Sequence, residues 1–372
     1  MGILRFSLAI VVLLHHLPDI PGKFLFLGGP EAVEAFYMIS GFYMALVLDR
    51  KYSHCTKSYK TFILSRFLRI YPQYLIVLFI TVLSYYTIAK LFMPPYENFI
   101  SVYFMEFSAL NLLEKLLVIS TSLSIFGQEL LVWLFDGKYH LLHPISIGWS
   151  LACELSFYIT APIIFHFSKK SLFILLVFFL LLRFALLPVM GITFVYFLPV
   201  TQYPLFLIGF LIYRSGDFKI PKPLMALSVI IFIAFMLFGA VTINSTMNVH
   251  LRIFTSEAVS VGRVGSAAYW LFYPSLAVLL WKIHKLDLGP FDRLDRLLGN
   301  ISYPVYLTHR IVINFFSLAL MSSIFVRIDI FFYAAIFIVT ILISVLLETV
   351  VQRRVDRFRG RFVKRAMKIE PG

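Results

Sequence analysis

The sequence predicts an all-α protein, a polytopic bundle of about ten transmembrane helices with both termini in the cytoplasm. Of its 372 residues, 60% are hydrophobic and 14% are charged, whereas soluble domains average about 45–50% apolar and about 25% charged residues. Apolar runs of 17 to 22 residues recur along the chain, and a helix needs about 20 residues to cross the hydrocarbon layer. The composition excludes a soluble domain, a disordered chain and a nucleic-acid module, and two cysteines make no disulfide scaffold.

Ten candidate spans follow one another along the chain. They cover residues 3–17, 32–48, 71–92, 146–167, 172–188, 194–213, 223–243, 267–284, 300–322 and 330–350. The first has no basic region before it beyond Arg5 and no small-residue cleavage pattern, so we interpret it as a retained helix rather than a signal peptide. The spans form one predicted domain, residues 1–350, and a basic cytoplasmic tail follows at 351–372.

The orientation follows from the positions of Lys and Arg, which are retained in cytoplasmic loops. With ten spans and the N-terminus inside, the inner loops hold 22 of these residues and the outer loops hold six. Counting residues 116–134 as an eleventh span would leave 10 inside and 18 outside. We therefore predict that residues 93–145 form an extracytoplasmic excursion, in which 116–134 is either re-entrant or interfacial. The tail accounts for much of the +14 formal charge and is predicted to lie on anionic lipid.

Ionisable residues inside the spans are candidates for function, because one charge at the bilayer centre costs roughly 2.5–3.5 kcal/mol. The candidates singled out for function are His15, His16, Glu154, Arg183, His309, Arg310 and Glu348. Arg5 and His16 are eleven residues apart, so on one helix they share a face and lie about 16 Å apart. An imidazole can take up and return a proton near neutrality, and His16 is the candidate general base.

Two further features allow a functional and a structural interpretation. Glu154 could orient a catalytic histidine, or it could pair with Arg183 or Arg310 and only stabilise the bundle. Arg66 and Arg69 are three residues apart on one helix face before the third span, where they could bind phosphate or anchor the helix at the inner membrane surface.

Several motifs occur in one order along most of the chain. They are Arg5-(ten residues)-His16, Phe36-Tyr37-Met38-Ile39-Ser40-Gly41-Phe42, Arg66-Phe67-Leu68-Arg69-Ile70-Tyr71-Pro72, Trp149-Ser150-Leu151-Ala152-Cys153-Glu154-Leu155-Ser156-Phe157-Tyr158, and Ile301-Ser302-Tyr303-Pro304-Val305-Tyr306-Leu307-Thr308-His309. The ordered set resembles the acyltransferase-3 family of bacterial membrane acyltransferases. Directly before Phe36-Tyr37, Glu34 and Ala35 stand where the family often has an aspartate and a leucine, followed there by two phenylalanines.

The resemblance implies a ten-helix membrane enzyme of the bacterial inner membrane. Such an enzyme takes an acyl group, most often acetyl, from cytoplasmic acyl-CoA to a hydroxyl of an envelope glycan or lipid-linked sugar, such as the lipopolysaccharide O-antigen. Acyl-CoA is then a co-substrate, and no tightly bound cofactor or metal is expected. The implied partners are the donor, the acceptor glycan and membrane lipid, without nucleic acid.

The resemblance also assigns roles to residues. It implies catalytic roles for His16, Glu154 and His309, with His16 either a general base or a transient acyl carrier. It implies donor binding by Arg66 and Arg69, and the inner-facing position of Arg5 makes that residue a candidate for the same role. The remaining motif residues, with a substrate or structural role, are Ser40, Gly41, Phe42 and Trp149. Arg310 is a further candidate because it is adjacent to His309, where it could hydrogen-bond the developing oxyanion.

Two other functions fit the same composition. A proton-coupled transporter of small solutes also carries buried His, Glu and Arg in about ten spans. A non-catalytic assembly partner in envelope biogenesis is the second alternative. Release of free CoA thiol from acetyl-CoA distinguishes the enzyme from both.

Overall fold

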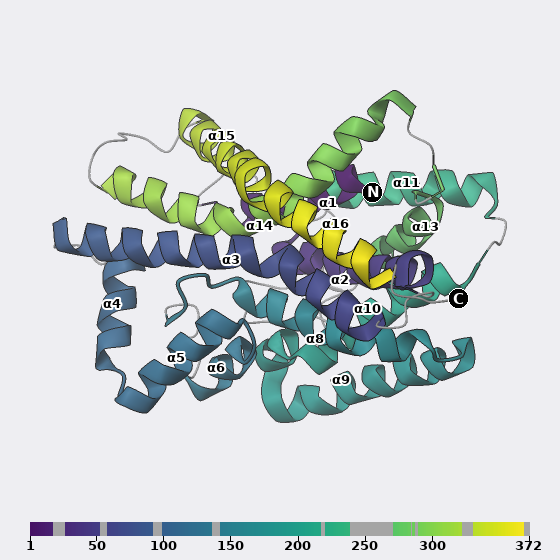
Figure 1. Ribbon diagram of the computed structural model, residues 1–372, viewed down its shortest axis with the longest axis horizontal. Coiled ribbons are helices and arrows are strands. Elements are labelled where there is room, and N and C mark those ends of the chain that lie inside the picture. Colours follow the sequence, from purple (N-terminus) through teal and green to yellow (C-terminus); the bar gives the residue numbers. More distant parts are fainter. Residues whose placement is uncertain are drawn as a thin grey trace, which may run out of the picture. The chain divides into compact units, whose positions relative to one another are not determined.

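The computed structural model describes residues 1–17, 27–52, 58–91, 99–135, 142–216, 220–238, 271–283, 285–286, 289–321 and 330–367 (Figure 1). All regular secondary structure in these ranges is helical, so the predicted all-α class is confirmed. The chain divides into two compact units. The first unit is Met1–Phe62 with Phe157–Ser302, and the second is Ile63–Ser156 with Tyr303–Gly372.

Each described helix lies within one unit or the other, except for three helices that contribute residues to both units. The first unit contains α1 (Gly2–His16), α2 (Gly29–Val47) with its π-helical end η2 (Leu48–Tyr52), α9 (Lys169–Phe197), α10 (Pro199–Arg214), α11 (Lys222–Phe238), α13 (Tyr273–Ile283) and the short η6 (Gly289–Phe291). The second contains α4 (Phe99–Ala109), α5 (Leu112–Ser124), α6 (Gln128–Leu134), α15 (Ile330–Leu346), η7 (Leu347–Gln352) and α16 (Arg353–Met367). Shared between them are α3 (Ser58–Leu91), α8 (Gly148–Phe165) and α14 (Asp292–Met321).

Every predicted span overlaps a helix of the structure, and five helices are long and apolar enough to cross a membrane. These five are Gly29–Tyr52, Tyr59–Thr87, Gly148–Phe165, Lys169–Gly191 and Ile330–Val363. Three shorter apolar helices are Gly2–His16, Lys222–Leu237 and Tyr273–Ile283. The structure therefore supports a membrane protein, and the total of ten spans remains a prediction.

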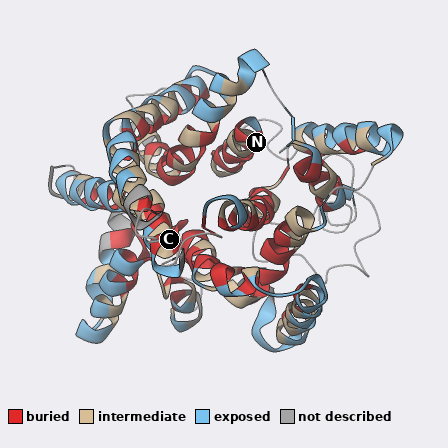
Figure 2. Ribbon diagram, turned by 45° about the vertical axis from the view of Figure 1, so that its right-hand side comes forward, coloured by how far each residue is buried: buried red, intermediate tan, exposed pale blue. Residues whose placement is uncertain are grey.

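Burial differs strongly among these helices (Figure 2). In Gly29–Tyr52, 67% of an 18-residue apolar stretch is buried inside the protein, whereas the corresponding share in Lys169–Gly191 is 11%. The side chains of Phe173, Phe178 and Leu181 on α9 are more than half exposed. Exposure of large apolar side chains to water is unfavourable, so this face of α9 is suited to contact lipid.

Helices α2 and α10 pack closely because each has a glycine at the crossing. A Cβ atom on Gly41 would overlap the backbone carbonyl of Phe206, and one on Gly209 would overlap that of Met38. Small residues allow such close backbone approach between membrane helices. Tyr37 stacks on Phe206, with ring centroids 4.7 Å apart. The pair α2 and α10 forms the centre of the first unit.

The eleventh candidate span, residues 116–134, is not one helix. Helix α5 ends at Ser124 and α6 begins at Gln128, and between them Ile125 and Gly127 have positive φ angles of 69° and 85°. The 13 residues of α5 extend only about 20 Å, less than the hydrocarbon thickness of about 30 Å. The break agrees with the prediction that this segment does not cross as a helix.

The basic tail continues the last apolar helix. Helices α15, η7 and α16 follow one another without interruption from Ile330 to Met367. The tail is tied to α3 within the second unit, where the guanidinium of Arg69 lies 3.5 Å from the Asp356 carboxylate. Gln352 also donates a hydrogen bond to Asp356, at 2.8 Å.

His143 in the excursion makes the second unit sensitive to acid. Its side chain is buried, its Nδ1 lies 3.0 Å from the hydroxyl of Ser122, and burial lowers its pKa to about 3. In the unfolded chain a histidine has a pKa of about 6.5, so below that pH the unfolded chain binds a proton that the folded unit excludes. The stabilisation is fully present above about pH 6.5 and is lost as the pH falls toward about 3.

We expect the thermal unfolding midpoint in detergent to decrease when the pH is lowered from about 7.5 to about 4.5, and to decrease less in His143→Gln. The control is His166→Gln, which replaces an exposed histidine of the first unit. Equal pH slopes for wild type and His143→Gln would contradict this account.

Candidate functional site

Arg5 and His16 lie toward opposite ends of α1, as the sequence predicts. The Arg5 guanidinium carbon is 5.9 Å from the centre of the Tyr43 ring, near the C-terminal end of α2. Helix α1 packs on α2 within the first unit. The contact places Arg5 at the same end of the first unit as the C-terminus of α2.

The tautomer of the neutral His16 ring follows from its hydrogen bond. Its Nδ1 lies 2.8 Å from the backbone carbonyl of Val12, one turn earlier on α1. A carbonyl only accepts hydrogen bonds, so Nδ1 carries the proton and the lone pair of the neutral ring is on Nε2. The ring is therefore arranged to act as a base through Nε2, with its tautomer set by its own helix.

His15 has a different environment. A Cβ atom on Gly29 would lie 2.6 Å from Cδ2 of the His15 ring, so this ring packs against the start of α2. The two histidine rings meet edge to face, with centroids 5.2 Å apart. The contact supports a packing role for His15.

The Ser40-Gly41-Phe42 motif lies at the α2–α10 crossing. Gly41 supplies the close backbone approach to Phe206 described above. Phe42 is fully buried and meets Tyr213 edge to face, with centroids 5.5 Å apart, whereas Ser40 is partly exposed. Gly41 and Phe42 therefore hold α2 against α10.

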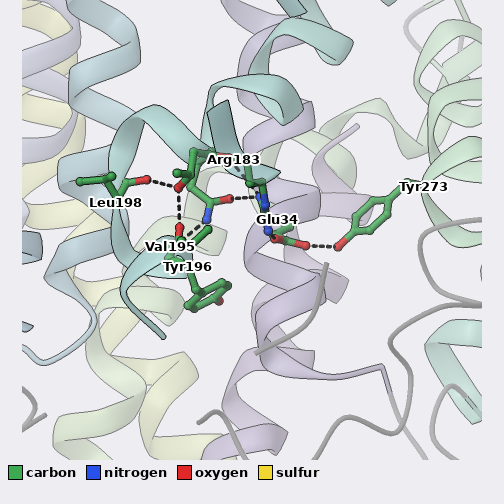
Figure 3. A network of polar contacts seen from close by, with 8 residues as sticks. Glu34, Arg183, Val195, Tyr196, Leu198 and Tyr273 are labelled. Atoms are coloured by element: carbon green, nitrogen blue, oxygen red, sulfur yellow. Dashed lines mark hydrogen bonds and ion pairs between the residues drawn. The ribbon is translucent and has the colours of Figure 1, made fainter. Parts of the chain in front are cut away.

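A buried ion pair joins α2 to α9 (Figure 3). Arg183 donates a hydrogen bond to the Glu34 carboxylate at 3.0 Å, and their side chains are 8% and 1% exposed. The same guanidinium donates to the Thr201 carbonyl at 3.1 Å and to the Gln202 side chain at 3.3 Å. Tyr273 donates its hydroxyl proton to the other Glu34 oxygen at 2.6 Å. The network joins α2, α9, α10 and α13.

Glu34 was not identified as a candidate from the sequence. The sequence offered Glu154 as a possible partner for Arg183, whereas the structure pairs Arg183 with Glu34. The sequence feature that predicts this pair is a carboxylate inside the span 32–48 together with an arginine inside the span 172–188. Two opposite charges that are each costly in the bilayer are expected to pair.

In the second unit, the motif residues Trp149, Glu154 and His309 come from α8 and α14. Trp149 and His309 are buried, and Glu154 is partly exposed. The Ser150 hydroxyl is 2.6 Å from that of Tyr306, and Glu154 interacts electrostatically with the Tyr306 ring hydroxyl. Nδ1 of His309 lies 2.7 Å from the Tyr306 carbonyl, which again leaves the neutral ring's lone pair on Nε2.

Arg310 is next to His309 and interacts electrostatically with Tyr85 of α3. Asn314, one turn later on α14, donates a hydrogen bond to the Tyr85 hydroxyl at 2.8 Å. Tyr85 is buried. Polar contacts therefore join α3 to α14 within the second unit.

The two arginines of the third motif differ in their surroundings. Both are partly buried on α3. Arg69 pairs with Asp356 of α16, at 3.5 Å. A phosphate bound by Arg69 would have to compete with this carboxylate.

The structure brings the candidate residues together in two groups. Arg5, His16, Ser40, Gly41 and Phe42 lie on α1 and α2 of the first unit, and the rest belong to the second. Within the described ranges, no group of three His, Cys, Asp or Glu side chains could hold a metal ion. The chemistry available is acid–base chemistry by histidine and carboxylate and anion binding by arginine.

Comparison with known proteins gives one match. The acyltransferase-3 family model, described as an acyltransferase domain, matches residues 1–349. No curated protein and no solved structure shows significant similarity to the chain. The match includes every candidate residue named above and extends over the two units except for residues 350–372.

We expect the buried ion pair to dominate the stability of the first unit. Replacing Glu34 by Gln leaves the Arg183 charge buried, which should lower the free energy of unfolding by about 3–5 kcal/mol. The measurement is unfolding of the purified protein in detergent.

The control is Asp292→Asn, which removes the exposed Asp292–Arg296 pair, 3.8 Å apart with side chains 46% and 71% exposed. An exposed pair contributes about 0–1 kcal/mol. If Glu34→Gln is no more destabilising than Asp292→Asn, the structural importance of the ion pair is disproved.

Proposed function

The chain belongs to the acyltransferase-3 family, and on that premise we propose that it is a membrane O-acyltransferase. In this proposal an acyl group, most simply acetyl, moves from cytoplasmic acyl-CoA to a hydroxyl of a cell-envelope glycan such as the lipopolysaccharide O-antigen. The observation that carries the chemistry is the hydrogen bond from His16 Nδ1 to Val12, which leaves Nε2 basic. The family match gives the transporter alternative no support.

The proposed reaction is a general-base acyl transfer. Nε2 of His16 takes the acceptor hydroxyl proton while the hydroxyl oxygen attacks the thioester carbonyl carbon. The carbon–sulfur bond then breaks, and the CoA thiolate accepts the proton from His16 and leaves as free thiol. A positioned base typically contributes about 10² to 10⁴ in rate, because a hydroxyl is far too weak an acid to ionise near neutral pH.

Glu154, His309 and Arg310 are proposed to assist this reaction. His309 has the same tautomer as His16, set by the Tyr306 carbonyl, and could act on a second proton. Arg310 carries a charge able to stabilise the developing oxyanion. Trp149, one position before the Ser150–Tyr306 contact, belongs to the same motif and is proposed to shape the site.

The donor is proposed to approach from the cytoplasm, where positive-inside orientation places both termini. Arg5, Arg66 and Arg69 then provide cations for its phosphates. Arg5 and His16 are separated by about 16 Å along α1, so the thioester must reach the histidine on an extended arm. Acyl-CoA has such an arm and acts here as a co-substrate.

The acceptor is proposed to meet the protein on the outer side of a bacterial inner membrane. The excursion 93–145 belongs to that side in the proposed topology, and α5 carries exposed Leu112, Leu113 and Leu116 that suit an interfacial position. A second outer loop, residues 244–266 between the predicted spans 223–243 and 267–284, is also proposed to face the acceptor, and it lies outside the described residues.

The decisive variant is His16→Gln. We expect it to lower acyl transfer at least about 100-fold, with the same amount of folded protein in the membrane. The measurement is release of free CoA thiol from labelled acetyl-CoA by purified protein supplied with envelope glycan. The matched control, His166→Gln, removes an exposed histidine of the same unit and should retain activity.

A nearly fully active His16→Gln enzyme would disprove the role of His16. Envelope glycan with the same ester content in cells with and without the gene, measured by mass spectrometry, would contradict the proposed acceptor.

Donor binding is tested by Arg66→Gln. Loss of one charge-assisted contact with phosphate should raise the KM for acyl-CoA about tenfold and change kcat little. Lys60→Gln, which removes an exposed cation from the same helix, is the control. An unchanged KM would indicate that Arg66 only anchors α3.

A further inference from the structure

A second group of cations, separate from Arg5, Arg66 and Arg69, surrounds a pocket in the first unit. The pocket has a volume of about 440 Å³, within the range of about 300–1,000 Å³ typical of small-molecule sites. It is lined by Asp49, Arg50, Tyr213, Arg214, Gly216, Trp281 and Lys285.

The pocket forms where three helices end. Asp49 and Arg50 belong to η2 at the end of α2, Tyr213 and Arg214 end α10, and Trp281 is in the last turn of α13. Gly216 follows α10 with a φ of 77°, which an L side chain rarely adopts. Its carbonyl accepts a hydrogen bond from the Trp281 indole at 2.9 Å. The wall between α10 and α13 is therefore held by a specific contact.

The side chains of the pocket are positioned by contacts within the first unit. Tyr213 donates its hydroxyl proton to Asp49 at 2.6 Å. Arg214 donates to the Phe165 carbonyl at 2.9 Å and lies over the Phe165 ring, 5.3 Å from its centre. The Lys285 ammonium is 4.4 Å from the centre of the Trp281 ring. Ordering of these long side chains in the free protein reduces the entropy cost of binding a ligand.

The charges of the lining select an anion. Among the lining residues that the structure describes, Arg50, Arg214 and Lys285 are opposed by one carboxylate, Asp49. An arginine presents a planar fork of donors that matches phosphate oxygens, and lysine adds a point charge. Asp49 and Tyr213 can hydrogen-bond to hydroxyl groups. The combination suits a phosphate ester attached to a hydroxyl-bearing group better than a simple anion.

The position of the pocket restricts the source of that ligand. Tyr213 contacts Phe42 as well as Asp49, and the neighbouring Tyr43 contacts Arg5. The pocket is thus at the Arg5 end of the first unit, which is cytoplasmic in the proposed topology. Phosphate esters there come from a soluble nucleotide, such as the nucleotide portion of acyl-CoA, or from the headgroup of an anionic phospholipid.

We propose that this pocket, formed by the ends of α2, α10 and α13, is a phosphate-ester binding site. The nucleotide as source rests on the proposed function, because acyl-CoA would deliver it, whereas the lipid as source does not. In both cases the ligand joins the ends of three helices that the sequence places far apart.

The test compares two double variants of the full-length protein. Arg50→Gln with Lys285→Gln removes two exposed pocket cations, and Lys169→Gln with Lys170→Gln removes two exposed lysines of the same unit outside the pocket. The first measurement is binding of labelled adenosine 3′,5′-bisphosphate in phosphatidylcholine nanodiscs. The second is retention of phosphatidylglycerol, measured by native mass spectrometry.

We expect the pocket variant to bind one of these two ligands about tenfold or more weakly than the control variant does. Selective loss of nucleotide binding identifies a nucleotide site, and selective loss of phosphatidylglycerol identifies a lipid site. If neither ligand distinguishes the pocket variant from the control, the proposal is overturned.

The outcome is separable from that of the proposed function. A wild-type protein that binds either ligand through the pocket but releases no CoA thiol with any acyl-CoA would refute the acyltransferase proposal and leave the pocket standing. An active enzyme in which both double variants bind both ligands equally would refute the pocket proposal and leave the acyltransferase proposal standing.

Discussion

The first unit depends on one buried ion pair between Glu34 and Arg183. Neither charge could remain alone in an apolar bundle, because an unpaired charge in the bilayer costs several kcal/mol. The pair also recruits Thr201, Gln202 and Tyr273, so that four helices are tied to one carboxylate–guanidinium contact. The same helices include α2, on which α1, the helix that carries His16, packs. Correct pairing of these charges thus positions the base of the proposed reaction.

The contacts distinguish motif residues that hold helices together from those proposed to take part in the reaction. Gly41 and Phe42 hold α2 against α10 through backbone approach and ring contact. His16 and His309 have one feature in common, a backbone carbonyl of their own helix at Nδ1. A helix can set a histidine tautomer with no second residue, and this leaves neighbouring carboxylates available for other roles.

Charge is distributed unequally between the two ends of the first unit. Arg5 and the pocket cations Arg50, Arg214 and Lys285 occur where α1 begins and α2, α10 and α13 end. His15 and Glu34 occur toward the opposite end, near the start of α2. Such a division suits a protein that takes a phosphorylated donor from one side of the membrane and carries out proton transfer deeper within the bundle.

The sequence alone determined that this is an all-α membrane protein, that it belongs to the acyltransferase-3 family, and that Arg5 and His16 share one helix. Those conclusions need only composition, hydropathy, motif order and helical periodicity, which are local properties of the chain. Only the tertiary structure decided that Arg183 pairs with Glu34, that residues 116–134 form two helices, and that residues 49, 214 and 285 line one pocket. Such pairings depend on which helices pack together and in which rotation, and the one-dimensional pattern of apolar residues does not encode either.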